Sequence, residues 1–436
     1  MTGRAGMRSA AAVVLAAAFV AASAAPAAAQ SAVPSMPAGE QPCIQPPTTT
    51  YEQEPWAQQI LAPDQAWDLT RGAGVTVAVV DTGVDAEVPQ LSAPGAVLPG
   101  ASVIEGDSGP ANDDCFGHGT FVAGIIAADP VPGTNFAGVA PDATILPVRV
   151  ATGLEEETGD TFSPDALAEG IRRAVDLGAD VVNVSASTSF PNEQLASVIR
   201  YAAERDVVVV ASAANGAQEG DPVTYPASYP GVIAVGAVDV AGAHASFSQT
   251  GPFLSVVAPG VDVISLGPNG PGHWQGSGTS YAAPFVAGTA ALIRSYYPHL
   301  TAPQIKQRLE ITANHPPTQL PDPALGWGTV NVTAAVASVV NGEGSDGSIV
   351  VPRSPAAAYV EPPDEIGPML ATVFTIMAAV GIALAVLTVR LSTSGHRRGW
   401  QAARTMRVIT KEKAPEAEQE QPEEPSEPAA GPALTP

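Results

Sequence analysis

The stretch V-T-V-A-V-V-D-T-G-V, residues 75–84, decides the fold of this chain. Its first six residues form a continuous apolar run, which is typical of a β-strand buried on both faces of a sheet. The run ends at Asp81, and small residues follow at once. Ligands gather at the carboxyl ends of strands in open α/β sheets. We therefore expect an inner strand at 75–80 and a cleft beside Asp81.

Further β-branched runs follow, with amphipathic stretches between them. Strands are expected at 143–150, 180–185, 206–213 and 232–238, and helices at Pro164–Leu177 and Pro191–Glu204. Strands that alternate with helices in this way favour a parallel sheet with helices on both faces. The sequence therefore predicts an α/β fold of three layers with a mostly parallel central sheet.

Two more motifs place a residue of catalytic type among small residues. F-G-H-G-T-F-V-A-G, residues 116–124, contains His118, and G-S-G-T-S-Y-A-A-P-F-V-A-G, residues 276–288, contains Ser280. The order Asp, His, Ser is one of the known orders of a nucleophilic triad. Each residue alone could simply end a strand or begin a helix. The three contexts together predict a serine protease.

The chemistry of such a site assigns a role to each residue. A serine hydroxyl is a weak nucleophile until a base removes its proton, so His118 is the expected base for Ser280. Asp81 is expected to hold the imidazole in the required tautomer. Ser280 precedes a small-residue helix, whose N-terminus adds positive potential for a developing oxyanion. Pro284 is expected in the first turn of that helix, where its missing N–H costs little.

A second oxyanion donor is expected from a side-chain amide. Asn215 follows the run V-V-V-V-A-S-A-A at 207–214 and is the candidate. A turn asparagine before glycine is the other explanation. Ser185, Ala186 and Ser187 follow another expected strand, and their edge could pair with an extended peptide substrate.

No metal or cofactor is expected. The other histidines of the expected protease domain have no metal-ligand spacing; they are His244, His273, His299 and His315. The run Asn112-Asp113-Asp114 could suggest a cation site, but we interpret it as a solvated turn that leads into the helix at His118.

The two ends of the chain indicate export and membrane anchoring. Residues 1–29 combine Arg4 and Arg8 with an alanine-rich apolar run and small residues at the end, as in a secretory signal. The uncharged stretch Met369–Val389 is long enough to cross a bilayer. Acidic residues precede it and basic residues follow from Arg390, which places the tail in the cytoplasm and the catalytic domain outside.

Six parts are therefore expected: a signal peptide at 1–29, an N-terminal extension at 30–54, a protease domain at 55–340, a Pro/Gly/Ser linker at 341–367, one transmembrane helix at 368–390 and a disordered cytoplasmic tail at 391–436. From Gln30 to Gly367 the chain has 10 Arg and Lys residues against 36 Asp and Glu residues. Such a surface repels nucleic acid, so we expect no nucleic-acid partner.

Cys43 and Cys115 are the only cysteines, and both lie in the expected exported part. An even pair in an oxidising compartment is typical of one disulfide, although two unpaired buried thiols are the alternative. Closing a loop of about 70 residues contributes about 4 kcal/mol in the chain-entropy account. The bond would hold the N-terminal segment beside His118.

The three motifs resemble the subtilase family of serine endopeptidases. Three more stretches carry the resemblance, which runs from Trp56 to Val340: G-V-A-P-D-A-T-I-L-P-V-R-V at 138–150, Y-P-A-S-Y-P-G-V-I-A-V-G-A-V at 225–238 and G-W-G-T-V-N at 326–331. The layout is similar to a narrower group, the mycosins, which are membrane-anchored subtilases of actinobacterial type VII secretion systems. The signal peptide, the stretch at 55–75, the cysteine before His118 and the single anchor carry this second resemblance.

The resemblance implies a subtilisin-like fold, a triad of Asp81, His118 and Ser280, and Asn215 as the oxyanion residue. It implies protein substrates that are exported, and a membrane secretion complex as partner. The extension before Tyr51 is too short for an independent pro-domain, and in mycosins it resembles a permanent wrap on the catalytic domain. Ala214 stands where many subtilases have glycine. Two other functions stay open: a mainly structural subunit of the secretion complex, and a general surface-attached protease.

Overall fold

The computed structural model describes residues 33–37, 43–152 and 163–340, together with 381, 384–391, 393–394 and 397–398. The chain divides into two compact units, Met1–Ala358 and Tyr359–Pro436. The expected signal peptide, the linker, most of the expected membrane span and nearly all of the tail lie outside the described residues.

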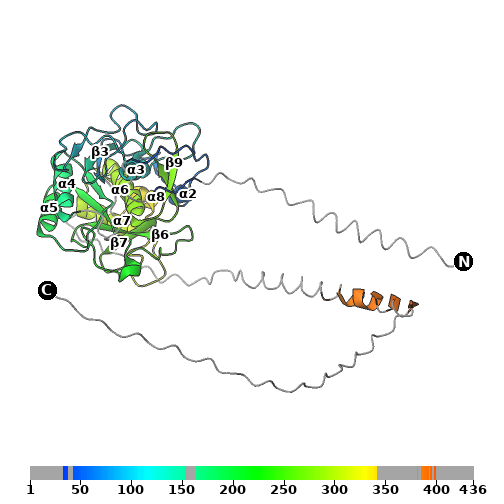
Figure 1. Ribbon diagram of the computed structural model, residues 1–436. Coiled ribbons are helices and arrows are strands. Elements are labelled where there is room, and N and C mark those ends of the chain that lie inside the picture. The colour runs from blue at the N-terminus through cyan, green and yellow to red at the C-terminus, as the bar shows by residue number, and fades with distance from the viewer. Residues whose placement is uncertain are drawn as a thin grey trace, which may run out of the picture. The chain divides into compact units, whose positions relative to one another are not determined.

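The first unit contains a seven-stranded sheet with the strand order β2-β3-β1-β4-β5-β6-β7 (Figure 1). Every neighbouring pair of strands is parallel. The strands are β1 (Thr76–Asp81), β2 (Ala101–Ser102), β3 (Thr144–Arg149), β4 (Val181–Val184), β5 (Val208–Ser212), β6 (Ile233–Val238) and β7 (Leu254–Pro259). The α/β class and the parallel sheet are confirmed, and the five expected strands appear within two residues of their expected ends.

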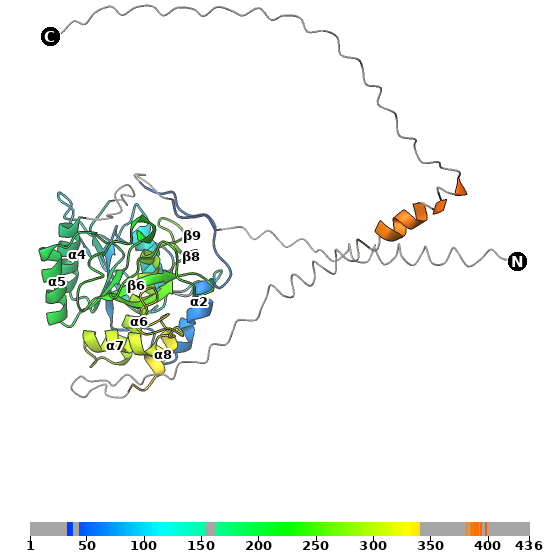
Figure 2. The same ribbon diagram turned by 90° about the horizontal axis from the view of Figure 1, so that it is seen from below.

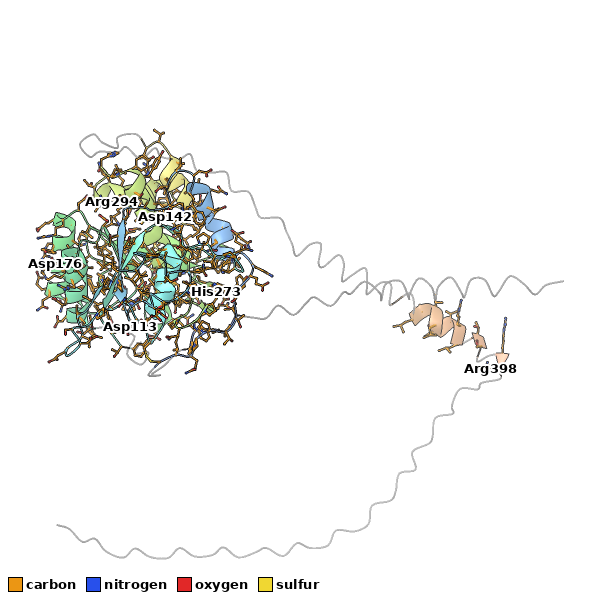
Figure 3. All side chains as sticks on the ribbon, turned by 90° about the horizontal axis from the view of Figure 1, so that it is seen from above. Asp113, Asp142, Asp176, His273, Arg294 and Arg398 are labelled. Carbon is orange, nitrogen blue, oxygen red and sulfur yellow. A yellow bond between two sulfur atoms is a disulfide. The ribbon has the colours of Figure 1, made fainter. Side chains whose placement is uncertain are left out.

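Side chains of β1 alternate between two hydrophobic cores. Val77 and Val79 join the core that contains α3 (His118–Ala127) and α6 (Thr279–Tyr296). Ala78 and Val80 join the other core, with α4 (Pro164–Asp176) and α5 (Glu193–Glu204). The sheet is thus covered on both faces, which makes three layers. In Figure 3, Asp176 on α4 and His273 lie on opposite sides of this unit.

Helix α6 is the central helix, because its residues Thr279 and Tyr281–Ile293 are buried on every side. Pro284 was expected in the first turn, but the structure places it inside the helix, as its sixth residue. Proline has no N–H, so the carbonyl four residues earlier loses its helical hydrogen bond. That carbonyl belongs to Ser280, and the Ser185 hydroxyl donates to it at 2.7 Å instead. A side chain beyond the end of β4 thus replaces the missing backbone donor.

The described part of the N-terminal extension lies along a small antiparallel pair, β8 (Val263–Leu266) and β9 (His273–Gly276). Ser35 forms a parallel bridge with Gln275. The N–H of His273 donates to the Thr49 carbonyl at 2.8 Å. Backbone hydrogen bonds of this kind add the extension to the edge of the pair and fix its path.

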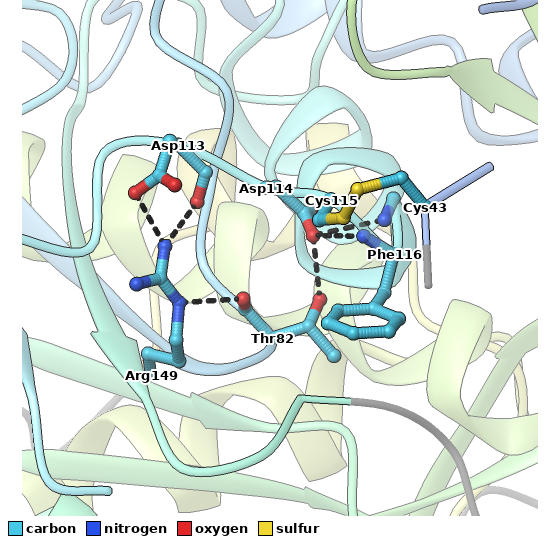
Figure 4. The surroundings of a disulfide bond; sticks show 8 residues. Cys43, Thr82, Asp113, Asp114, Cys115, Phe116 and Arg149 are labelled. Atoms are coloured by element: carbon cyan, nitrogen blue, oxygen red, sulfur yellow. Dashed lines mark hydrogen bonds and ion pairs between the residues drawn. A yellow bond between two sulfur atoms is a disulfide. The ribbon is translucent and has the colours of Figure 1, made fainter. Parts of the chain in front are cut away.

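A disulfide joins the extension to the catalytic domain (Figure 4). Cys43 and Cys115 are 72 residues apart in sequence, and their Cα atoms are 4.6 Å apart. Next to it, the Ile44 N–H donates to the Cys115 carbonyl at 2.9 Å. The expected pairing is therefore present, three residues before His118.

The remaining short elements complete the first unit: α2 (Trp56–Leu61), η1 (Pro63–Ala66), η2 (Ala217–Glu219), α7 (Ala302–Thr312) and α8 (Val332–Ala337). Element η1 packs against α8, so the chain just after the extension lies next to the end of the protease domain. In Figures 1 and 2, α2 also lies beside α8.

In the second unit, residues 384–391 are helical and exposed. Among the described residues, no helix has both the length and the apolar character needed to cross a membrane.

Candidate active site

Asp81 and His118 meet at the carboxyl end of the sheet. Asp81 is the last residue of β1, and His118 is the first residue of α3. The His118 Nδ1 lies 2.8 Å from Asp81 Oδ1 and 2.9 Å from Oδ2. Since a carboxylate only accepts, Nδ1 carries a proton, and in the neutral imidazole Nε2 therefore has a free lone pair. The two side chains are almost completely buried, so the pair is fixed in the geometry of a base and its orienting acid.

The electrostatics of the pair favour a charged imidazole. Burial alone lowers the pKa of His118, but the charge of Asp81 and its hydrogen bond outweigh burial, and Asp114 adds to them. The pKa of His118 therefore lies above its ordinary value. A proton taken up by Nε2 is consequently stabilised, which a general base requires.

Ser280 and Asn215 border the same small space. Asn215 Oδ1 accepts from the Thr279 N–H at 2.9 Å and from the Thr279 hydroxyl at 3.0 Å, which fixes the orientation of the amide. A Cβ placed on Gly278 would lie 3.0 Å from Ser280 Oγ and 3.4 Å from Asn215 Nδ2. The hydroxyl of Ser280 and the amide nitrogen of Asn215 therefore both lie within contact distance of this Cβ position, which glycine leaves empty.

Ala214, the position that departs from the family pattern, has a backbone φ of 81°. This left-handed conformation is strained for alanine and ordinary for glycine. The Ala214 N–H donates to the Thr279 hydroxyl at 3.0 Å. The Thr279 hydroxyl thus links the strained loop after β5 to the start of α6. The same hydroxyl donates to Asn215 Oδ1 and helps to orient the Asn215 amide.

Ser185, Ala186 and Ser187 are all buried beside β4. The Ser185 hydroxyl donates to the Ser280 carbonyl and accepts from Asn183 Nδ2 at 2.9 Å. Its side chain therefore supports the helix that carries Ser280. A role for this segment in substrate binding depends on its backbone.

Two nearby residues were missed from sequence. The Tyr281 ring lies 5.3 Å from the His118 ring and is buried, and burial raises the pKa of its hydroxyl. The expectation of a solvated turn at 112–114 is wrong for Asp114, which is buried and accepts hydrogen bonds from the first turn of α3. Only their nearness to His118 and Ser280 in the sequence could have indicated either residue.

Within the described ranges, no three acidic, histidine or cysteine side chains are grouped closely enough to hold a metal ion. His273 is buried, accepts from the Tyr51 N–H at 3.1 Å through Nδ1, and has its pKa lowered by burial to about 4. It is therefore a neutral structural residue that receives the N-terminal extension.

Comparison with known proteins identifies the family. The model of the subtilase family matches residues 72–328, a range that contains Asp81, His118, Asn215 and Ser280. The chain belongs to the subtilase family. It is a serine endopeptidase of the Asp-His-Ser class.

This subtilase is similar to mycosins and to a subtilisin. Mycosin-4 of Mycobacterium tuberculosis is 38% identical over 378 residues, which are 78% of this chain and 81% of that protein. Subtilisin DY of Bacillus licheniformis is 42% identical over 268 residues, 61% of this chain and 92% of that protein. The solved structure of the MycP3 protease from the type VII (ESX-3) secretion system has 34% identity and a TM-score of 0.58, and the match covers 70% of this subtilase and 97% of MycP3.

Proposed function

We propose that this subtilase is a membrane-anchored endopeptidase that cuts exported proteins in association with a type VII secretion system. Asp81, His118 and Ser280 are its triad, and Asn215 is its oxyanion residue. The observation that carries the proposal is the buried Asp81–His118 pair, with Ser280 at the start of the central helix.

The proposed reaction proceeds through an acyl-enzyme. His118 Nε2 takes the hydroxyl proton of Ser280 as Oγ attacks the peptide carbonyl carbon, and Asp81 stabilises the resulting imidazolium. His118 then gives this proton to the leaving amine. In the second half, water attacks the acyl group with His118 again as the base, and Ser280 is regenerated.

The negative charge of the tetrahedral intermediate needs donors beside Ser280 Oγ. The Asn215 amide nitrogen is the proposed first donor, and the backbone N–H of Ser280, in the first turn of α6, is the proposed second donor. The helix N-terminus adds positive potential at the same place. Such donors act strongly because they are already oriented before the reaction begins.

Gly278→Ala is expected to lower kcat roughly 10²–10³-fold, as for the loss of one oxyanion donor. The new methyl group would occupy the space between Ser280 Oγ and Asn215 Nδ2. Gly278 has a φ of 161°, which alanine adopts without strain, so folding should persist. Gly216→Ala is the matched control, because its added Cβ meets no atom closer than 3.8 Å. Normal turnover by a folded Gly278→Ala variant would contradict the assignment of this space to the oxyanion.

Substrate binding is proposed to use the backbone of residues 185–187, which would pair with an extended peptide by β-augmentation. The side chains there are small, so they leave room for the peptide. The proposed location follows from the ends of the chain: the signal peptide exports the protease, and residues 368–390 hold it in the membrane with its tail inside the cell.

A second function, support of the secretion complex itself, has a specific observation in its favour. MycP1, described as an essential component of the type VII (ESX-1) secretion system, has a solved structure that is 31% identical to this chain, and the match covers 97% of it. The two functions are compatible, because one surface of the domain could bind partners while the triad remains open.

Three strains separate these functions: one with the full chain, one with Ser280→Ala and one without the protein. We expect the Ser280→Ala strain to lose specific new N-termini among its exported proteins. If secretion persists with Ser280→Ala but fails without the protein, the structural function operates as well. Identical N-termini in all three strains would contradict proteolysis of exported proteins. Broad loss of peptide hydrolysis at the cell surface of the Ser280→Ala strain would instead favour a general protease.

A further inference from the structure

Asp114 is a second buried carboxylate beside the Asp81–His118 pair, and the proposed mechanism does not use it. It is 4% exposed, although its neighbour Asp113 has a side chain that is 77% exposed. Its two oxygens accept five hydrogen bonds: from the Thr82 hydroxyl at 3.0 Å, the Phe116 N–H at 3.1 Å, the Gly117 N–H at 2.8 Å, the Thr120 N–H at 2.9 Å and the Thr120 hydroxyl at 2.7 Å. All five are donated to the carboxyl group, which fits its ionised form.

These hydrogen bonds lead toward both members of the pair, and Figure 4 shows those that Asp114 accepts from Thr82 and Phe116. On one side, Asp114 accepts from the Gly117 and Thr120 N–H groups at the start of α3, the helix whose first residue is His118. On the other side, its partner Thr82 donates its own N–H to Asp81 Oδ1 at 2.8 Å. The Thr82 hydroxyl also accepts from the Gly119 N–H at 3.1 Å. One carboxylate thus links the end of β1 to the start of α3.

We infer that Asp114 is a positioning residue for peptide hydrolysis, which acts through Thr82 and the first turn of α3 to hold Asp81 and His118 in register. The inference rests on the proposed triad. The charge of Asp114 has a second role, because it favours the imidazolium that forms on His118 during each turnover.

The ionisable groups around His118 shift one another's pKa. Burial raises the pKa of Asp114, against the hydrogen bonds from Thr120 and Gly117, and the nearby Asp81 raises it further. Asp114 in turn adds to the raised pKa of His118. From α6, the neutral Tyr281 ring faces His118. Arg149 on β3 binds the Thr82 carbonyl and Asp113, so its charge lies on the far side of Thr82.

Asp114→Asn in the full chain tests the inference. The asparagine side chain would place an NH₂ donor against groups that themselves donate to Asp114, and it would lack the negative charge of the carboxylate. We expect kcat to fall about 10-fold or more with little change in KM. We expect the acid limb of kcat/KM to move down by about 0.5–1 pH unit, because a less stabilised imidazolium gives up its proton at lower pH. Asp113→Asn, one residue away and exposed, should leave the limb in place.

Two further measurements keep the inference testable if Asp114→Asn misfolds or if the proposed function is wrong. Thr82→Val removes the link to Asp114 and keeps the side-chain shape, and Thr82→Ser restores the hydroxyl. We expect about a 10-fold loss of kcat in the first variant and recovery in the second. Equal activity in the two would overturn the inference even if Asp114→Asn does not fold.

An NMR titration of ring-labelled His118 gives its pKa without any turnover. A lower pKa in Asp114→Asn than in the unmodified chain supports the inference, and an unchanged pKa overturns it. Absence of Ser280-dependent hydrolysis in the unmodified chain would instead refute the proposed function, so the two failures are distinguishable.

Discussion

Ser280→Ala is expected to lower peptide hydrolysis roughly 10⁴-fold or more, and to abolish covalent labelling by a fluorophosphonate probe. The reason is that the probe and the peptide carbonyl both require a hydroxyl activated by His118. The hydrogen bond from Ser185 goes to the Ser280 carbonyl and not to its hydroxyl. Removing Oγ should therefore leave the start of α6 unchanged, and the loss will be one of chemistry and not of folding.

The measurement uses the full chain in detergent, with labelling, turnover of a peptide pool and thermal unfolding followed together. Ser277→Ala is the matched control, because Ser277 lies three residues earlier and its hydroxyl accepts only from the Asp262 N–H and faces Asp262 Oδ1. We expect Ser277→Ala to label normally. Labelling that persists in Ser280→Ala would mean that another nucleophile reacts, and the triad assignment would then be wrong.

Much of the fold is predictable from sequence because its signals are local. A strand buried on both faces contains a short apolar run in the sequence, and β1, β3 and β5 each contain one. The motifs of Asp81 and His118 coincide with a strand end and a helix start. Chain order and parallel pairing then bring these ends to one edge of the sheet, so the site follows from the fold without any knowledge of tertiary contacts.

Other features depend on contacts that no local pattern contains. Strand β2 has two residues, and Ser255 interrupts the apolar run of β7 while it accepts a hydrogen bond from the distant Lys306. The position of Pro284 inside α6 is tolerated only because Ser185, 95 residues away from Ser280, supplies the missing donor. A helix-forming pattern cannot reveal such a partner.

The turn before His118 shows the same limit at the level of single atoms. Asp113 and Asp114 are identical in type and adjacent in sequence, yet one pairs with Arg149 at the surface and the other is buried under α3. Composition alone favoured a solvated turn, and tertiary geometry decides against it for Asp114.

Asp81→Asn is expected to lower kcat roughly 10⁴-fold while the fold persists. The Thr82 N–H already donates to Asp81 Oδ1, so the oxygen of an asparagine would stay there and its NH₂ group would take the place of Oδ2, 2.9 Å from His118 Nδ1. A donor at that place favours the tautomer with the proton on Nε2, and this tautomer cannot accept the proton of Ser280.

The pH profile separates this explanation from simple loss of structure. Because Asp81 is the main cause of the raised pKa of His118 against burial, its removal should move the acid limb of the remaining activity to lower pH. Asp180→Asn is the matched control: Asp180 accepts from the Thr76 N–H at 2.8 Å, at the opposite end of β1. We expect that variant to keep both its turnover and its acid limb. A folded Asp81→Asn enzyme within tenfold of normal kcat would show that His118 needs no orienting carboxylate here.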